Sequence, residues 1–467
     1  MIKNFFSDKV FFKNMLKLGV PIALQQLLYS VFSVTDTAMV AQLGADSTAG
    51  VGLANRWFFF IMLVNFGLIA GTMALVSQYW GIKDYRNIRR TTGISLMIGL
   101  GLTAVFSICA LLFTRPMISV FADDPAMIEQ GVDYLHMLVF GLVIFAFNFI
   151  FSTSLKATET VKIPLMASIF SILVNVFLNW VFIFGHLGAP AMGVKGAALG
   201  TVISYAANML FMMIAVRIKD HPLMHHIGEY FAMDKAFVRK FFKVMMPALI
   251  NEVLWVLGTM TYSVVLGRYG SVNYGAYTIF NSVESMFFTF FIGLSGATSI
   301  LVGKELGRGN IQKGYEYAAK VLIMSPFIAA ILGSLMILLR YPVLGLMQIP
   351  DQNLVQMSAK LIVIYAVASP VRMIPYMTIV GIFRSGGDTI SGLWIDSINV
   401  WLVGVPVTLF VGFVLKAPFI FAFLAMYSED VLKSVLCIII FVKKKWLNQL
   451  TTDSEVLYAE PPALTEE

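Results

Sequence analysis

The sequence predicts an all-α integral membrane protein whose twelve transmembrane helices form two six-helix lobes related by a pseudo-twofold axis. Of the 467 residues, 58% are hydrophobic and only 13% are charged, with a mean hydropathy of +0.82. Soluble proteins carry about 25% charged residues. The apolar residues fall into runs about as long as a bilayer crossing, and the second half of the chain repeats the pattern of the first.

The apolar runs number twelve, and each reaches the roughly 20 residues that a helix needs to cross a membrane. The first six lie near residues 16–43, 48–80, 91–113, 130–154, 163–184 and 196–216. The second six lie near residues 244–268, 275–303, 317–339, 358–383, 390–411 and 417–442. Several runs exceed the minimum length, which predicts helices that are tilted or that extend beyond the membrane.

The distribution of Lys and Arg predicts the orientation, because cytoplasmic loops are enriched in these residues. With the N-terminus inside, 24 of the 33 Lys and Arg residues fall in inner segments and five in outer loops. The remaining four lie within or at the ends of the apolar runs. We therefore expect a multi-pass protein of the cell membrane, the inner membrane in a two-membrane cell, with both termini in the cytoplasm.

An internal repeat predicts how the helices are grouped. A shift of 226 residues superposes several Gly, Pro and Asn residues: Pro21 on Pro247, Gly44 on Gly270, Asn55 on Asn281, Gly67 on Gly293 and Gly81 on Gly307. Six spans per repeat give both halves the same orientation, so the pseudo-twofold axis runs along the membrane normal. The predicted organisation is an N-lobe (1–220), a cytoplasmic linker (221–240), a C-lobe (241–445) and an acidic cytoplasmic tail (446–467).

Asp36 lies in the apolar run SVFSVTDTAMVAQLG, where a carboxylate costs at least ~2.5 kcal/mol. It precedes Gly44 by eight residues, which places it roughly 12 Å below the outer face at 1.5 Å per residue. The same count places Asn175 and Asn179, one helical turn apart, roughly 9–15 Å below that face. Thr201 lies roughly 9 Å below it. We therefore expect these four polar side chains to share one depth in the N-lobe.

This set of oxygens suits Na⁺ or a shared proton, since it combines a carboxylate with amide and hydroxyl groups. The alternative is a structural role, because Asn and Thr in membrane helices often hydrogen-bond only to neighbouring helices, at about 0.6 kcal/mol each. For each Asn alone both interpretations stay open. A lone carboxylate is too costly for such a role, which favours a functional Asp36.

The chain resembles the multidrug and toxic compound extrusion (MATE) transporters over nearly its whole length. The resemblance rests on KLGVPIALQQ followed by VTDTAMVAQLG, on GVGLAN and VSQYWGIKD, and on ATETVKIPL and GVKGAALGTVISY. Each motif alone is weak, whereas their order and their repetition are specific. The resemblance implies export of amphipathic, often cationic compounds, driven by inward flow of H⁺ or Na⁺, with no other cofactor.

The resemblance also implies roles for individual residues. The family's cation site carries over to Asp36, Asn175, Asn179 and Thr201, although some relatives have a second carboxylate where this chain has Asn179. In the family, the first helix is proposed to bend at a proline after the Asp is protonated. Pro21, fifteen residues before Asp36, corresponds to that proline, so we expect a hinge there. A static kink is the alternative.

Four charged residues within the C-lobe spans predict a substrate cleft: Glu252, Glu284, Arg372 and Asp396. Acidic side chains facing a low-dielectric cleft attract cations. Glu284 and Arg372 fall near the midplane and can instead form a structural ion pair. Some relatives have an Asp near the position of Arg372, and its absence here argues against a cation site of that kind in this lobe.

The predicted function is therefore a cation-coupled antiporter that exports small molecules by alternating access. The alternative is a lipid-linked oligosaccharide flippase of the same superfamily shape, but such proteins line the cleft with several basic residues and here only Arg372 is deep. A channel would require subunit symmetry and pore rings. No catalytic motif indicates an enzyme, and nothing indicates nucleic acid binding. We expect a monomer whose partners are its substrate and the lipid bilayer.

Overall fold

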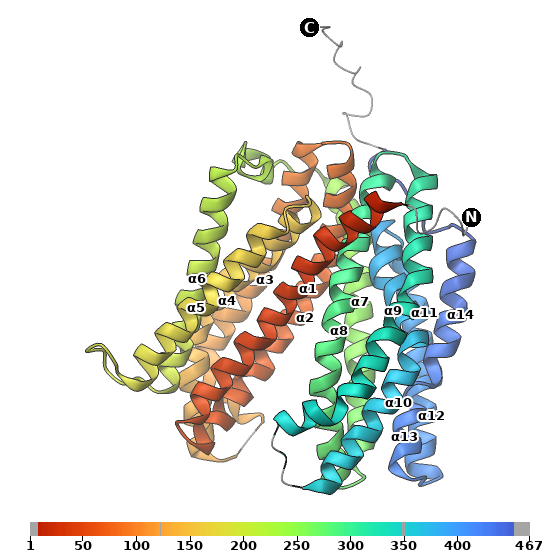
Figure 1. Ribbon diagram of the computed structural model, residues 1–467. Coiled ribbons are helices and arrows are strands. Elements are labelled where there is room, and N and C mark those ends of the chain that lie inside the picture. The colour runs from red at the N-terminus through yellow and green to blue at the C-terminus, as the bar shows by residue number, and fades with distance from the viewer. Residues whose placement is uncertain (1–7, 122, 348, 350, 453–467) are drawn as a thin grey trace, which may run out of the picture. The chain divides into compact units, whose positions relative to one another are not determined.

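The computed structural model describes residues 8–121, 123–347, 349 and 351–452. Nearly all of these residues lie in helices, and no β-strand occurs among them. This agrees with the sequence, because a backbone in lipid must satisfy its own hydrogen bonds and a helix does so within one segment. The predicted all-α membrane fold is confirmed (Figure 1).

The first half of the chain contains six long helices and two short 3₁₀ turns. They are α1 (Lys9–Ala41), α2 (Ala45–Gly81), α3 (Tyr85–Ser119), α4 (Pro125–Ala157), α5 (Lys162–Phe184), α6 (Val194–Ile218), η2 (Pro222–Met224) and η3 (Ile227–Tyr230). The two turns fall in the predicted linker, so part of that segment is structured.

The second half begins with α7 (Lys235–Gly267), α8 (Ser271–Gly307), α9 (Ile311–Leu346) and α10 (Gln352–Tyr376). The tenth span continues into the π-helical η4 (Met377–Phe383). The eleventh alternates between α and π geometry through α11 (Thr389–Asn399), η5 (Val400–Gly404), α12 (Val405–Leu409) and η6 (Phe410–Val414). The chain then forms α13 (Phe419–Ala425) and α14 (Ser428–Val442).

Eleven helices of the described chain are long and apolar enough to cross a membrane, counting the interrupted tenth and eleventh spans as one helix each. The predicted twelfth span, near 417–442, is divided, because α13 ends at Ala425 and α14 begins at Ser428. Eleven of the twelve predicted spans are thus long helices, and the twelfth is present as the two helices α13 and α14. The break in this last span was not predicted.

Aspartate caps mark the start of several helices. Asp84 accepts hydrogen bonds from Asn87 at the start of α3, and Asp124 does so from the first turn of α4. Asp351 and Asp388 cap α10 and α11 in the same way. An Asp in this position satisfies backbone N–H groups that have no partner within the helix, so these short polar loops fix where the helices begin.

By the contacts within the chain, the protein divides into two compact units. The first-half unit contains Leu24–Val76 and Asp84–Phe242. The second-half unit contains the described residues up to Ala23, the segment Ser77–Lys83 and the chain from Lys243 onward. The first part of α1 and the end of α2 thus pack within the second-half unit. The boundary in α1 falls between Ala23 and Leu24, two residues after Pro21.

Within the second-half unit, the ends of α2 and α8 cross at glycines that the repeat superposes. A Cβ on Gly81 would lie 2.3 Å from the carbonyl oxygen of Lys304, and one on Gly307 would lie 2.0 Å from that of Gln78. The 226-residue shift relates Gly81 to Gly307 and Gln78 to Lys304. The crossing therefore has the symmetry of the repeat, and only glycine permits so close an approach at either position.

The segment after α14 also packs here. The Gln78 amide accepts a hydrogen bond from the Leu450 N–H at 2.7 Å and donates one to the Asn448 carbonyl at 3.1 Å. Trp446 is fully buried, and the Thr451 hydroxyl donates to the Gly307 carbonyl at 2.8 Å. Residues 446–452, assigned to the tail by sequence, are thus part of the packed protein, because the buried Trp446 and the hydrogen bonds to Gln78 and Gly307 hold them in place. The rest of the predicted tail lies outside the described residues.

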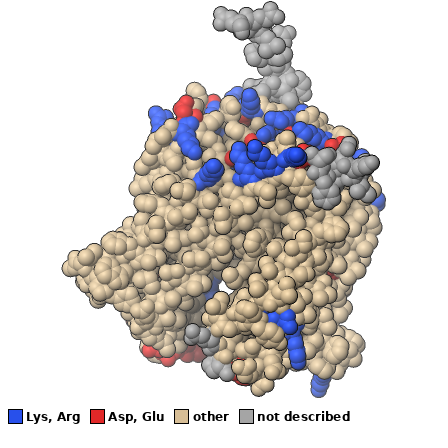
Figure 2. Space-filling model, in the orientation of Figure 1, with Lys and Arg blue, Asp and Glu red and all other residues tan. Residues whose placement is uncertain are grey.

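The surface matches a chain surrounded by lipid. Large apolar side chains are exposed along the helices, for example Leu112 at 71%, Leu338 at 74% and Leu402 at 71%. Figure 2 shows that most visible Lys and Arg side chains lie near one end of the helices, with uncharged surface between the ends. This pattern fits transmembrane helices whose basic loops lie on one side.

Candidate functional site

Asp36 is buried in the first-half unit, with 7% of its surface exposed. One carboxylate oxygen, Oδ1, accepts a hydrogen bond from Nδ2 of Asn179 at 2.7 Å. The other, Oδ2, lies 3.5 Å from the hydroxyl of Tyr134, which donates to it. The carboxylate therefore has a donor for each oxygen, which reduces the cost of its burial.

The other predicted residues continue this network. Nδ2 of Asn179 also lies 3.3 Å from Oδ1 of Asn175, and Nδ2 of Asn175 donates to the Thr201 hydroxyl at 3.3 Å. Thr201 in turn donates to the Ala197 carbonyl at 3.0 Å. Asn175 and Asn179 are fully buried and Thr201 is 2% exposed. The structure thus joins all four residues in one hydrogen-bonded cluster, as the depth count predicted, while their role as a cation site stays a prediction.

Local sequence explains why α5 and α6 approach closely enough to form this cluster. A Cβ on Gly196 would lie 2.5 Å from the Phe182 carbonyl oxygen, and one on Gly200 would lie 2.4 Å from Oδ1 of Asn179. Gly196 and Gly200 are one helical turn apart, so they form one bare stripe on α6. The missing side chain at Gly200 is the space that the Asn179 amide occupies.

The Asn179 amide has an unused oxygen. Its Oδ1 is buried and has no hydrogen-bond partner among the described residues. A buried carbonyl oxygen without a donor is costly, and a cation is one group that satisfies it. The cluster contains a single carboxylate, and the described chain contains no group of three or more His, Cys, Asp and Glu side chains placed to hold a metal. Such a donor set fits a proton or a monovalent cation better than a divalent metal.

Sequence reasoning missed Tyr134. A tyrosine in an apolar helix is usually taken as a filler or as an interface residue, so its hydroxyl was not counted. The signal was available, because Tyr134 lies nine residues into α4, roughly 14 Å from its start. That depth matches the depth counted for Asp36.

Gln25, one helical turn after Pro21, is a second missed residue. Its side-chain amide lies within hydrogen-bonding distance of the Ser168 hydroxyl at 3.1 Å, the Ser152 hydroxyl at 3.3 Å and the Pro164 carbonyl at 3.4 Å. These contacts attach α1 to α4 and α5 immediately beyond the boundary between the two units. Pro21 lies inside the continuous helix α1, where it cannot donate to the carbonyl of Lys17. The predicted hinge thus lies close to the place where α1 passes from one unit to the other, and hinge motion itself stays a prediction.

The predicted cleft residues of the second-half unit all form ion pairs. Glu284 and Arg372 pair at 3.4 Å, as one interpretation of the sequence expected, and the Arg372 guanidinium lies 5.0 Å from the Tyr427 ring centroid. Glu252 pairs with Arg384 at 2.8 Å. These acids are therefore partly neutralised, and a cleft role for them stays a prediction.

Asp396 belongs to a larger cluster on α11 and α14. Lys433 Nζ lies 2.6 Å from Oδ1 of Asp396 and 2.9 Å from Oε1 of Glu429, and it is 4% exposed. The Tyr262 hydroxyl donates to Oε2 of Glu429 at 3.1 Å. Gly404 faces the same place, since a Cβ there would lie 2.1 Å from the Tyr262 hydroxyl. Lys433 and Glu429 lie four residues apart on α14, but helical spacing alone does not reveal that α14 faces α11.

A sequence model of the MatE family matches residues 21–181 and 247–410, which is more than half of the chain. The chain belongs to the MatE family. The two matched stretches begin at Pro21 and Pro247, the residues that the internal repeat superposes. The resemblance stated from the motifs is thereby confirmed, and the protein is a multi-pass membrane transporter of this family.

Several multidrug resistance proteins are similar to this MatE protein. The probable multidrug resistance protein NorM of Thermotoga maritima is 24% identical over 437 residues, which cover 93% of each chain. The probable multidrug resistance protein YoeA of Bacillus subtilis is 27% identical over 325 residues, or 69% of each chain. The multidrug resistance protein MdtK of Photorhabdus laumondii is 22% identical over 400 residues, covering 84% of this chain and 86% of its own.

Solved structures of MATE transporters share the fold of this MatE protein. A MATE crystal structure in the bent conformation superposes with a TM-score of 0.82 at 18% identity, covering 93% of this chain and 94% of the other. A MATE structure in the straight conformation gives 0.81 at 17% identity, covering 93% and 96%. At these identities the likeness shows the fold alone, and that fold is the two-lobe architecture the repeat predicted.

Proposed function

We propose that this MatE protein is a cation-coupled antiporter that exports amphipathic, often cationic compounds, and that Asp36 is its coupling carboxylate. The observation that carries the proposal is a lone buried carboxylate bonded to Asn179 and Tyr134, with Asn175 and Thr201 one step further along the network. The names of the relatives, which are multidrug resistance proteins, support the class of cargo.

The proposed chemistry at Asp36 is a change of bonding partners. When a proton or Na⁺ binds, the carboxylate loses its net charge, and the hydrogen bonds that the anion accepts from Asn179 and Tyr134 weaken, since charge-assisted bonds are about twice as strong as neutral ones. Oδ1 of Asn179, which has no partner among the described residues, is placed to accept from the new proton or to bind the ion after small adjustments. The cation state of Asp36 is thus coupled to the packing of α1 against α5.

Alternating access follows from this coupling in the proposal. The Asp36 cluster acts on the part of α1 beyond Pro21, while the earlier part packs within the second-half unit. A change in how α1 packs at Asp36 then alters the bend at Pro21, where a helical hydrogen bond is already missing. Since a ligand shifts an equilibrium only by its differential affinity for two states, the bound cation must favour one of the two bends.

The proposed cargo contacts are the acids of the second-half unit, Glu252, Glu284 and Asp396. Each is paired with a base that contacts it from another helix or loop. A cationic substrate would compete with that base for the carboxylate, so selectivity would come from exchange of one ion pair for another. Glu252→Gln is then expected to weaken export of cationic dyes more than that of neutral ones, and equal loss for both classes would contradict the assignment.

The experiment that tests the proposal is cation-swap transport in proteoliposomes. Dye efflux is measured with an imposed H⁺ gradient, with an imposed Na⁺ gradient and with neither, using the same protein preparation. The proposal expects efflux that requires one of the two gradients. Equal efflux in all three conditions would contradict cation coupling, while flipping of a glycan-lipid precursor without dye efflux would favour a flippase.

A further inference from the structure

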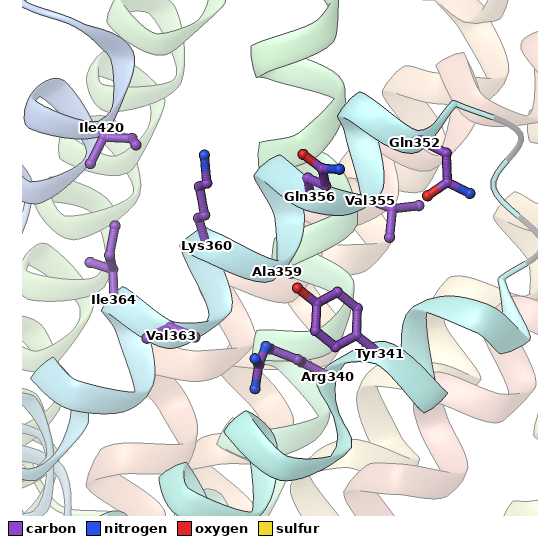
Figure 3. A pocket seen from close by; sticks show the side chains of 10 residues that line it. All are labelled: Arg340, Tyr341, Gln352, Val355, Gln356, Ala359, Lys360, Val363, Ile364 and Ile420. Atoms are coloured by element: carbon purple, nitrogen blue, oxygen red, sulfur yellow. The ribbon is translucent and has the colours of Figure 1, made fainter.

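A groove of about 580 Å³ lies where α9 ends and α10 begins. Its walls come from the last turns of α9, the first four turns of α10 and Ile420 of α13. Figure 3 shows basic, amide and aromatic side chains on these walls together with aliphatic ones. The groove lies within the second-half unit, whereas the Asp36 cluster belongs to the first-half unit, and nothing in the proposed transport mechanism uses the groove.

Two cations line the groove without acidic partners. Neither Arg340 nor Lys360 has a carboxylate of the described chain within ion-pair distance. Two other basic residues belong to predicted outer loops, on the same side of the membrane as Arg340, and both form ion pairs. Arg115 pairs with Glu129 at 3.4 Å, and Lys195 pairs with Asp133 at 3.1 Å. Within the described residues, the two positive charges of the groove therefore have no ion-pair partner.

The guanidinium of Arg340 is held in place by α9 itself. It lies 4.6 Å from the ring centroid of Tyr341 and donates one hydrogen bond to the Ile337 carbonyl. A guanidinium has five N–H donors, so most remain available to a ligand. In Figure 3 the hydroxyl end of Tyr341 points toward α10, where it adds a further polar group to the groove.

The facing wall on α10 carries a polar stripe in an otherwise apolar helix. Gln352, Gln356 and Lys360 follow one another at intervals of four residues, so they lie on one face of α10, and all three are exposed. Beside them Val363 and Ile420 line the apolar part of the groove. The combination fits an amphipathic ligand with an anionic, oxygen-rich head and an apolar body.

The predicted ninth span and the length of α9 indicate that this groove lies at the membrane surface. The 36 residues of α9 span about 54 Å, roughly 24 Å more than the hydrocarbon core of a bilayer. The helix must therefore extend beyond the hydrocarbon core at one end or at both. Arg340 directly follows the predicted ninth span, near 317–339, so it is expected at the outer interface, where phosphodiester groups are found.

We propose that this groove binds the phosphodiester headgroup of an anionic phospholipid. Arg340 bonds to the phosphate, and Lys360, whose side chain extends away from Arg340 in Figure 3, adds a second positive charge to the groove. The amides of Gln352 and Gln356 bond to headgroup oxygens or to a glycerol head, and the aliphatic wall holds the start of an acyl chain. A zwitterionic lipid would bring its own cation into a groove whose described lining residues include no acid, so the site distinguishes the two lipid classes by charge.

Native mass spectrometry of the purified protein tests this assignment. Phosphatidylglycerol and phosphatidylcholine with identical acyl chains are titrated onto wild type, onto Arg340→Gln/Lys360→Gln and onto Arg115→Gln/Lys195→Gln. The last variant loses two cations that are already paired, so it is the matched control. Each basic residue near a membrane surface changes the affinity for an anionic lipid about fivefold. The first double variant should therefore lose roughly thirtyfold in affinity for phosphatidylglycerol, and the control should lose less than about threefold.

Two further arms keep the assignment falsifiable. Arg340→Lys/Lys360→Arg retains the charges and should retain most of the phosphatidylglycerol preference. A variant that had lost its fold would lose this preference. Equal binding of the two lipids by wild type, or equal loss in the test and control variants, would overturn the site. Stabilisation of the delipidated protein by inorganic phosphate as large as that by phosphatidylglycerol would overturn the lipid assignment in favour of a soluble anion.

Discussion

Gly200→Ala is the change that perturbs the coupling cluster without removing any of its polar groups. The added methyl would lie 2.4 Å from Oδ1 of Asn179, at least 0.6 Å inside the 3.0 Å limit that real Cβ atoms observe. The amide must move away, which lengthens its 2.7 Å hydrogen bond to Asp36. Overpacking of this kind costs about 1–3 kcal/mol, and alanine in a helix recovers about 1 kcal/mol relative to glycine. We therefore expect a net loss of stability between 0 and about 2 kcal/mol.

The effect on transport should exceed the effect on stability. A weakened charge-assisted hydrogen bond changes the free energy of the ionised Asp36 by about 1.5–3 kcal/mol, which shifts the cation affinity of the site by roughly tenfold or more. The assay is the cation concentration at half-maximal dye efflux in proteoliposomes. Gly52→Ala is the control, because a Cβ there meets no atom within 4 Å. If both variants show the wild-type cation dependence, the packing of Asn179 against Gly200 does not position the site.

Three other outcomes follow from particular contacts. Pro21→Ala restores a helical hydrogen bond worth about 1 kcal/mol and should slow turnover about fivefold while leaving cation affinity unchanged; wild-type turnover would mean that the proline is only a kink. Burial, and to a smaller extent the positive charge of the nearby His225, lowers the pKa of His221 to about 4. The stability that neutral His221 contributes above its ordinary pKa near 6.5 should therefore be lost as the pH falls from 6.5 to 4. In His221→Gln the thermal unfolding temperature should depend less on pH over that range. The same pH dependence as in wild type would contradict the assignment. Lys433→Met leaves the Asp396 and Glu429 carboxylates buried without their base and should destabilise the protein by about 3–5 kcal/mol. Adding Asp396→Asn and Glu429→Gln should restore most of the loss, and failure of that rescue would show that the charges are not the cause.

The transmembrane spans and the polar cluster were predictable because each rests on a count along one helix. Hydrophobic length sets a span, and a rise of 1.5 Å per residue sets the depth of Asp36, Asn175, Asn179 and Thr201. The cluster formed as predicted because polar side chains at one depth in a lipid environment have few other partners.

Features that depend on the rotation of one helix against another were not predictable in this way. The ion pair between Lys433 and Asp396 requires α14 to face α11, and no count within either helix fixes that rotation. Tyr134 was overlooked because its ring is an ordinary residue in an apolar helix, and only the position of Asp36 gives its hydroxyl a role. The packing of Trp446 and Thr451 lies beyond the last span, where hydrophobic length is uninformative.

The most direct test of the coupling mechanism is gradient-driven efflux by Asp36→Asn. Asparagine keeps the size of the side chain and its ability to bond with Asn179 and Tyr134, but it fixes the neutral state. The variant should insert and purify as a monodisperse protein like wild type, since the cluster loses no hydrogen-bonding group. Measured in proteoliposomes with equal amounts of protein, its dye efflux should show no dependence on an imposed H⁺ or Na⁺ gradient. Efflux equal to that of wild type under the same gradient would show that Asp36 is structural and that coupling occurs elsewhere.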